Sequence, residues 1–268
     1  MAAERRAGGG LRLVASYLRF NLAAGMEYRA AFITQVLGMI ANDAAFIFFW
    51  ILLLDRVGGS IGGYGFREVM FLWSLSAAGF GLSAVVFGNA SYLSRLIAAG
   101  ELDVYLLQPK PVLPNLLASR MSVSAWGDVA YGLLLFALTQ EVTAGRAALF
   151  ALVVALMAVG LTAVRVLYHS LTFWWGNAEE FASMASEMTL SFMIYPDTIF
   201  EGPTRWLLHS LLPAGLLAYL PARLFARLEL APLLAMLGGD AALVAAALAA
   251  FHLGLRRYES GNRIGARL

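Results

Sequence analysis

The sequence contains no cysteine and a single lysine, and both absences limit its chemistry. Without cysteine there is no disulfide and no thiolate metal site. The three histidines stand too far apart for a ligand pair at helical spacing (His169, His209 and His252). Lys110 lies between two prolines without a glycine-rich run before it, so no phosphate-binding loop of an ATPase is present. We therefore expect no catalytic, cofactor or metal site in this chain.

Charge is also scarce. Charged residues make up 13% of the chain and hydrophobic residues 60%, and the mean hydropathy is +0.73. One soluble core cannot bury that much apolar surface. The basic residues are spread along the chain instead of forming a tract that would bind nucleic acid. The composition predicts an all-α integral membrane protein with membrane lipid as its solvent, organised as a single domain over 1–268.

A helix needs about 20 apolar residues to cross a bilayer. Five segments meet this requirement, at 31–54, 66–88, 113–138, 147–169 and 232–255. A sixth, 177–195, begins polar and becomes apolar before it stops at Pro196. We predict six transmembrane helices.

Arginine and lysine predict the orientation, because cytoplasmic connections retain positive charge. If the N-terminus is inside, only six of the 19 basic residues fall outside (Arg56, Arg67, Arg146, Arg205, Arg223 and Arg227). Both termini are therefore predicted to be cytoplasmic.

Two segments outside these spans are predicted to contact the membrane without crossing it. Residues 11–30 place Leu11, Val14 and Leu18 on one face and polar residues on another, which predicts an interfacial helix. A short soluble helix is the alternative. In 197–230, Pro213 cuts an apolar stretch into pieces of about seven residues, which reach about 10 Å. We predict a re-entrant external hairpin before the last span, marked by three prolines (Pro196, Pro213 and Pro221).

The connection between the second and third predicted spans, 89–112, has an amphipathic pattern. Its apolar residues recur at helical spacing beside Arg95, and Gly100 is suited to end that helix. Glu101 and Asp103 follow, alternating with Leu102 and Val104. We predict a compact cytoplasmic helical element.

Here the sequence resembles the six-span permeases of ABC-2-type exporters, in particular the subgroup whose second connection reads approximately G-E-L-D-x-x-L-x-x-P. The matching residues of this connection are Gly100, Glu101, Leu102, Asp103, Leu106 and Pro109. A second match is Tyr195-Pro196, Ile199-Phe200, Leu212-Pro213 and Tyr219-Leu220-Pro221-Ala222, and a third is Glu27-Tyr28-Arg29-Ala30.

The resemblance implies a division of labour in a bacterial inner membrane. Two permease chains, identical or different, would pair around a pathway, and each would rest on a separate ATP-binding subunit that holds ATP and Mg. The connection 89–112 would be the coupling element, with its contacts made by Arg95, Gly100, Glu101, Asp103, Tyr105 and Gln108. The cargo stays open among a drug, a lipid-linked molecule and a peptide.

Acidic residues inside predicted spans are costly and mark candidate functional sites. The candidate pathway residues are Asp43, Trp50, Asp128 and Glu187. The alternative is that the acids pair with Arg120, Arg165 or a hydroxyl and only fix packing. A different function, an ion-coupled carrier that uses these carboxylates, would be expected to show an internal repeat, and we find no convincing one.

Overall fold

The computed structural model describes residues 2–209 and 212–259. It is all-helical apart from a two-stranded hairpin of two residues each, β1 (Ser60–Ile61) and β2 (Tyr64–Gly65). The predicted all-α class is confirmed. The five longest helices are α1 (Ala2–Gly25), α2 (Arg29–Arg56), α3 (Phe66–Val86), α8 (Ala144–Ser170) and α13 (Leu230–Leu255).

Shorter elements connect them. The first half of the chain contains η1 (Met26–Tyr28), η2 (Gly88–Tyr92), α4 (Leu93–Ala98), α5 (Asp103–Leu106), α6 (Val112–Ala118) and α7 (Ala125–Thr139). The second half contains α9 (Thr172–Trp175), α10 (Glu179–Met193), η3 (Asp197–Ile199), α11 (Gly202–His209), η4 (Gly215–Tyr219) and α12 (Leu220–Arg227).

Four helical segments in the described part of the chain are long and apolar enough to cross a bilayer. They are Gly10–Arg56, Phe66–Val86, Ala144–Trp175 and Leu230–Leu255, and they include four of the predicted spans. The helices α7 and α10 have 15 residues each. A length of 15 residues corresponds to about 22 Å, which is short for a 30 Å hydrocarbon core. The count of six spans stays a prediction.

The predicted third span, 113–138, is wrong as a continuous helix. The structure divides it into α6 and α7, with an irregular segment at 119–124. Backbone groups of this segment bond to the end of α3 and the start of η2 instead of to a helix of their own: Ser122 N–H donates to Ala84 O, and Arg120 O accepts from Gly88 N–H. Tertiary hydrogen bonds replace the helical ladder here, so the polar backbone is still satisfied.

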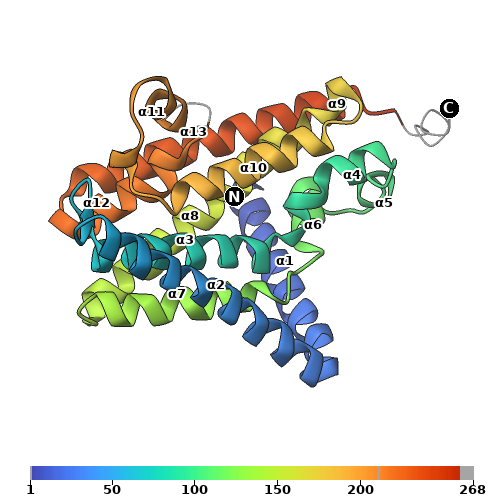
Figure 1. The fold of residues 1–268 in the computed structure, drawn as a ribbon. Helices are drawn as coiled ribbons and strands as arrows, with labels where there is room; N and C mark the ends of the chain where they lie inside the picture. The colour runs from blue at the N-terminus through green and yellow to red at the C-terminus, as the bar shows by residue number, and fades with distance from the viewer. Residues whose placement is uncertain (1, 210–211, 260–268) are drawn as a thin grey trace.

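The helix α3 is central, with α7 on one side and α8 on the other (Figure 1). Small residues allow the close approach of α3 and α7. A Cβ on Gly132 would lie 2.7 Å from Ser74 O, and a Cβ on Gly81 would lie 2.8 Å from Ala125 O. The hydroxyl of Ser74 donates to Gly132 O across this contact at 2.7 Å. Membrane helices commonly associate through such small residues and interhelical hydrogen bonds.

The segment after α10 folds back along the bundle: α12 packs against α13 and α3, whereas α11 lies outside them (Figure 1). Its second half is longer than the seven residues expected, because the π-helical turn η4 continues directly into α12, over 215–227. Pro221 lies in the first turn of α12 and has no N–H for an earlier carbonyl, which favours a widened turn before it. Leu217, Ala218 and Tyr219 are fully buried. At 13 residues, about 20 Å, this arm is still shorter than a membrane crossing.

Candidate coupling surface and intramembrane site

The predicted coupling region is ordered, and Gly100 ends its main helix. Gly100 has a φ of +73°, a left-handed conformation that favours glycine. Glu101 N–H donates to Leu96 O at 2.9 Å, and Gly100 N–H donates to Ile97 O at 3.2 Å. These two bonds are the pair that defines a Schellman cap. The chain therefore turns sharply between α4 and α5.

Side chains attach this region to the bundle. Asn89 donates to Leu116 O at 3.0 Å, and the Ser94 hydroxyl lies 2.8 Å from Nδ1 of His169 on α8. The Tyr105 hydroxyl lies 3.0 Å from Ser119 Oγ. Leu102 is completely buried beneath the turn. The region is a fixed part of the fold.

Further polar contacts connect the region to α1. Asn115 on α6 donates to Gln108 Oε1 at 3.1 Å and accepts from the Tyr17 hydroxyl at 2.7 Å. Asn21 donates to Ala118 O at 3.0 Å. The helix α1 runs crosswise to the other long helices (Figure 1), an orientation that suits the predicted interfacial helix at 11–30.

One face of the coupling region is uncovered. Leu107 is 87% exposed and Val104 62% exposed, and Leu106 and Glu101 are also exposed. Asp103 is partly buried instead, and its carboxylate lies beside the hydroxyl of Tyr258, just past the end of α13. Burial, followed by the Asp103 carboxylate, raises the pKa of Tyr258 to about 12. Asp103 thus contacts the chain's own C-terminal segment, whereas Glu101 faces outward.

Within the bundle, two acids from distant parts of the sequence meet. Gly127 allows α2 to approach α7 closely, since a Cβ there would lie 2.6 Å from Val36 O and 2.7 Å from the Cβ of Met39. One turn further along α2, the carboxyl group of Asp43 lies within hydrogen-bonding reach of that of Asp128. Both side chains are buried, with 7% and 6% of their surface exposed. They line a cavity of about 210 Å³ together with residues of α3 and α10.

The arginines expected as partners of these acids lie elsewhere. The guanidinium of Arg165 donates to Ser83 Oγ at 3.3 Å and lies 4.9 Å from the ring centre of Phe80. The guanidinium of Arg120 lies 3.9 Å from the ring centre of Tyr92. The packing alternative in which these arginines pair with Asp43 or Asp128 is therefore wrong.

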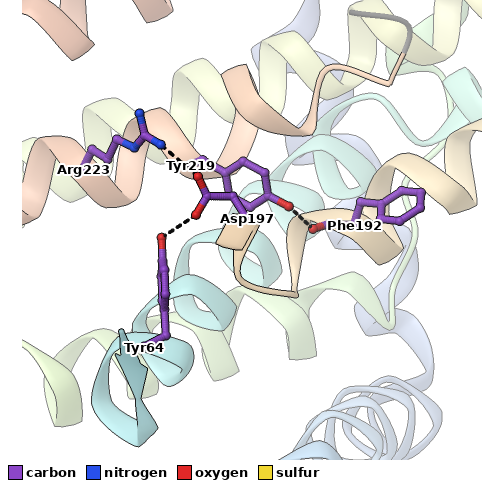
Figure 2. A network of polar contacts seen from close by, with 5 residues as sticks. All are labelled: Tyr64, Phe192, Asp197, Tyr219 and Arg223. Carbon is purple, nitrogen blue, oxygen red and sulfur yellow. Dashed lines mark hydrogen bonds and ion pairs between the residues drawn. The ribbon is translucent and has the colours of Figure 1, made fainter. Parts of the chain in front are cut away.

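At the opposite end of the bundle from the coupling region, Figure 2 shows a network around Asp197. Asp197 is 3% exposed, forms an ion pair with Arg223 at 2.8 Å and accepts a hydrogen bond from the Tyr64 hydroxyl at 3.1 Å. The Tyr219 hydroxyl donates to Phe192 O at 2.8 Å. These bonds connect the β1–β2 hairpin, η3 and α12, so the fold-back segment is joined to the loop between α2 and α3.

Three of the six arginines expected outside come together at this end. Arg67, Arg146 and Arg223 line one cavity of about 340 Å³. The helices α4 and α5 of the coupling region lie at the other end (Figure 1). The predicted topology places these three arginines on one side of the membrane, and the structure places them at one end of the bundle.

A family model described as "ABC-2 family transporter protein" matches residues 40–262 of the chain. The chain belongs to the ABC-2 transporter family. The match extends from the middle of α2 past the end of α13 and so includes the acid pair, the coupling region and the fold-back segment. No curated protein and no solved structure matched the chain.

Membership makes this ABC-2 transporter chain the membrane permease component of an ABC transporter, whose ATPase is a separate subunit with which it associates. Its apolar helices support a multi-pass membrane protein. The resemblance seen in the sequence is confirmed at the level of the family.

The other predicted pathway residues of the ABC-2 chain lie apart from the acid pair. Trp50 is 1% exposed and packs with Tyr195, with ring centres 5.7 Å apart. Glu187 is exposed on α10 and does not line the cavity of the pair. Asp240 is a further buried acid, on α13, which the sequence analysis did not single out although its position in an apolar span was visible. Ser76 also lines the cavity; from the sequence, a serine at its position in an apolar helix is expected to mediate helix packing.

Proposed function

We propose that this chain is the permease of an ATP-driven exporter, which forms the substrate pathway with a second permease chain and is driven by a separate ATP-binding subunit. That subunit would bind ATP and Mg, and this chain would need no cofactor. The observation that supports this proposal most strongly is the coupling region, a capped and anchored element with an uncovered face at one end of the bundle. Because the element is fixed to α6 and α8, force applied to its surface would reach the helices of the pathway.

The chemistry of that face suits a protein partner. Leu107, Val104 and Leu106 are exposed together, and exposed apolar patches bounded by polar residues are typical of interaction sites. Glu101 at the edge adds one negative charge. A groove with an apolar floor and a basic rim on the ATP-binding subunit would match it.

The proposal includes a location and a topology. The chain would be a multi-pass protein of a bacterial inner membrane with both termini cytoplasmic and the coupling region on the same side. The segment 197–230 would enter the outer leaflet without crossing it. Its buried π-helical turn supports this reading, because irregular backbone at membrane depth is tolerated where protein surrounds it.

Coupling is tested with a double variant of the exposed face, Glu101→Ala with Leu107→Ser. The matched control is Glu141→Ala with Val142→Ser, an exposed acid and an exposed apolar residue in the loop between α7 and α8. We expect the first variant to insert normally but to bind the ATP-binding subunit at least 10-fold more weakly and to lose substrate-stimulated ATP hydrolysis. The control should behave as wild type. Equal association of the two variants would refute the coupling role of this face.

The contact between Asp43 and Asp128 favours one alternative, an ion-coupled carrier. Proteoliposomes separate the two functions. Transport that requires the ATP-binding subunit and ATP supports the exporter, whereas transport by the chain alone under a proton gradient supports the carrier.

A further inference from the structure

The cavity beside the acid pair has the features of a binding site for a cation. It lies between α2, α3, α7 and α10 and has a volume of about 210 Å³. Asp43 and Asp128 provide its acidic wall, and Phe46, Trp73 and Phe80 are among the residues that line the rest. The four helices place one compact charged surface inside an otherwise apolar hollow.

The acidic wall has few hydrogen-bond donors. Neither Oδ2 of Asp43 nor Oδ2 of Asp128 accepts a hydrogen bond from an N–H or O–H group in the described part of the chain. Asp43 Oδ1 has only a long contact, 3.5 Å, with the side-chain amide of Asn42. A buried carboxylate without donors or a counter-charge is costly. A proton held between the two carboxyl groups relieves their mutual repulsion but leaves one negative charge in the cavity.

None of the described side chains supplies the missing positive charge. Arg165, the buried arginine of α8, contacts Ser83 and the ring of Phe80 and makes no ion pair with either aspartate. Asn42 is neutral. A negative charge on the pair would therefore have no cationic partner among the residues whose side chains the structure describes.

The apolar wall is suited to a cation with an apolar body. The rings of Phe46 and Trp73 lie with centres 4.7 Å apart. Aromatic faces attract a nearby cation, most strongly when both are removed from water. Trp73 also keeps its indole N–H without an acceptor although its side chain is 6% exposed. An acceptor atom on a bound molecule would satisfy that donor.

We propose that this cavity binds an organic monocation, a protonated amine on an apolar body, as the cargo of the permease. The ammonium group donates to the two Oδ2 atoms of Asp43 and Asp128, and the apolar body lies against Phe46 and Trp73. The inference rests on the proposed function, since it names the chemical class that the permease carries. Its test measures binding to the chain without ATP and without the partner subunit, so its failure is distinguishable from a failure of coupling.

The experiment is equilibrium binding of radiolabelled 1-adamantylamine to the full chain in lipid nanodiscs, with empty nanodiscs to subtract partition into lipid. The competitors are unlabelled 1-adamantylamine and 1-adamantanol, which share the apolar body and differ in charge. We expect saturable binding and at least 10-fold weaker competition by the alcohol, because a charge-assisted hydrogen bond is lost. Equal competition by the amine and the alcohol, or the absence of saturable binding, overturns the proposal without requiring a variant.

The variant arm is the double change Asp43→Asn with Asp128→Asn, since a single change leaves one carboxylate in the cavity. The matched control is Asp240→Asn, a buried acid of α13 that faces Gly160 of α8 and does not line this cavity. We expect the double variant to bind at least 10-fold more weakly and the control to bind as wild type. If Asp240→Asn weakens binding as much as the double variant, or the double variant binds normally, the assignment to this cavity is wrong. Size-exclusion profiles confirm that each variant remains folded.

Discussion

The contact between α3 and α7 gives a sharp test of the packing, through the substitution Gly132→Ala. The added Cβ would lie 2.7 Å from the Cβ of Ala78, 2.7 Å from Ala78 N and 2.7 Å from Ser74 O. Non-bonded carbon atoms prefer about 3.5–4.0 Å, so the helices would have to separate by about 1 Å. Two of the three neighbours are backbone atoms, which no rotamer change can move. The separation would also stretch the bond from the Ser74 hydroxyl to Gly132 O.

Overpacking costs about 1–3 kcal/mol, and a clash with backbone atoms that cannot move aside belongs at the upper end, about 2–3 kcal/mol. Replacing a helical glycine by alanine returns up to about 1 kcal/mol through helix propensity. The net loss of about 1–2 kcal/mol predicts an apparent melting temperature lower by about 2–8 °C. The measurement is thermal unfolding of the purified chain, followed by size-exclusion chromatography after heating.

Gly38→Ala is the matched control, because Gly38 is also helical, on α2, and a Cβ there would meet nothing within 4 Å. It should leave the melting temperature unchanged or raise it slightly. If the melting temperatures of Gly132→Ala and Gly38→Ala differ by less than about 1 °C, the close approach of α3 and α7 is refuted, because the expected difference is larger.

Three further predictions concern the other end of the bundle and the topology. Arg223→Met should destabilise the chain by about 1–2 kcal/mol, a value kept low because Arg223 is half exposed and its ion pair is screened by water. This variant should melt at a lower temperature than Asp197→Asn, because it leaves the buried Asp197 carboxylate unpaired, whereas Asp197→Asn removes that charge. The reverse order of melting temperatures would contradict the role of the ion pair. Burial, followed by Asp197, raises the pKa of Tyr64 from 10.0 to about 12. The stability that the neutral phenol contributes should therefore be present below about pH 10 and lost as the pH rises towards 12. The difference in phenolate absorbance between wild type and Tyr64→Phe should show a transition near pH 12 and not near pH 10. Single cysteines at Ala3 and Gly145 should be labelled by an impermeant reagent in intact cells only at Gly145, and external labelling at Ala3 would overturn the orientation.

The long helices could be predicted from the sequence because a bilayer demands continuous apolar length. The spans expected at 31–54, 66–88, 147–169 and 232–255 each lie within a helix or differ from one by two residues. The cap at Gly100 was also predictable, since a lone glycine after an amphipathic turn favours the left-handed conformation that it has. These features depend on local sequence alone.

The break between α6 and α7 could not be predicted from the local sequence. Met121 and Val123 keep the segment apolar enough to continue a span, and the hydrogen bonds that replace the helix come from Ala84 and Gly88, more than 30 residues earlier. A pattern of hydropathy does not contain such tertiary partners. The sequence therefore predicted the apolarity of 113–138 correctly and its continuity wrongly.

For the acid pair, too, the sequence predicts the unusual residues but not their tertiary contact. That Asp43 and Asp128 are unusual inside apolar segments was visible in the sequence, but their contact depends on which helices are neighbours. Gly127 decides this, because only a residue without a side chain lets α2 approach α7 beside Asp128. Glu187 has the same chemistry and lies exposed on α10. The presence of a charge within a predicted span identified all three acids as candidates, and helix packing places Asp43 and Asp128 in the cavity but not Glu187.

The helix α3 connects the two surfaces to which the proposals assign binding and coupling. Trp73 and Ser76 of α3 line the cavity of the acid pair, and the same helix leads through η2 into the coupling region. The hydroxyl of Ser83 bonds to Thr162 Oγ1 on α8 at 2.9 Å, and Ser94 of α4 contacts His169 on the same helix. The coupling region is therefore attached to α3 by the chain and to α8 by buried hydrogen bonds. If the ATP-binding subunit displaces that region, α3 is the helix through which the displacement would reach the cavity that α3 lines with α2, α7 and α10.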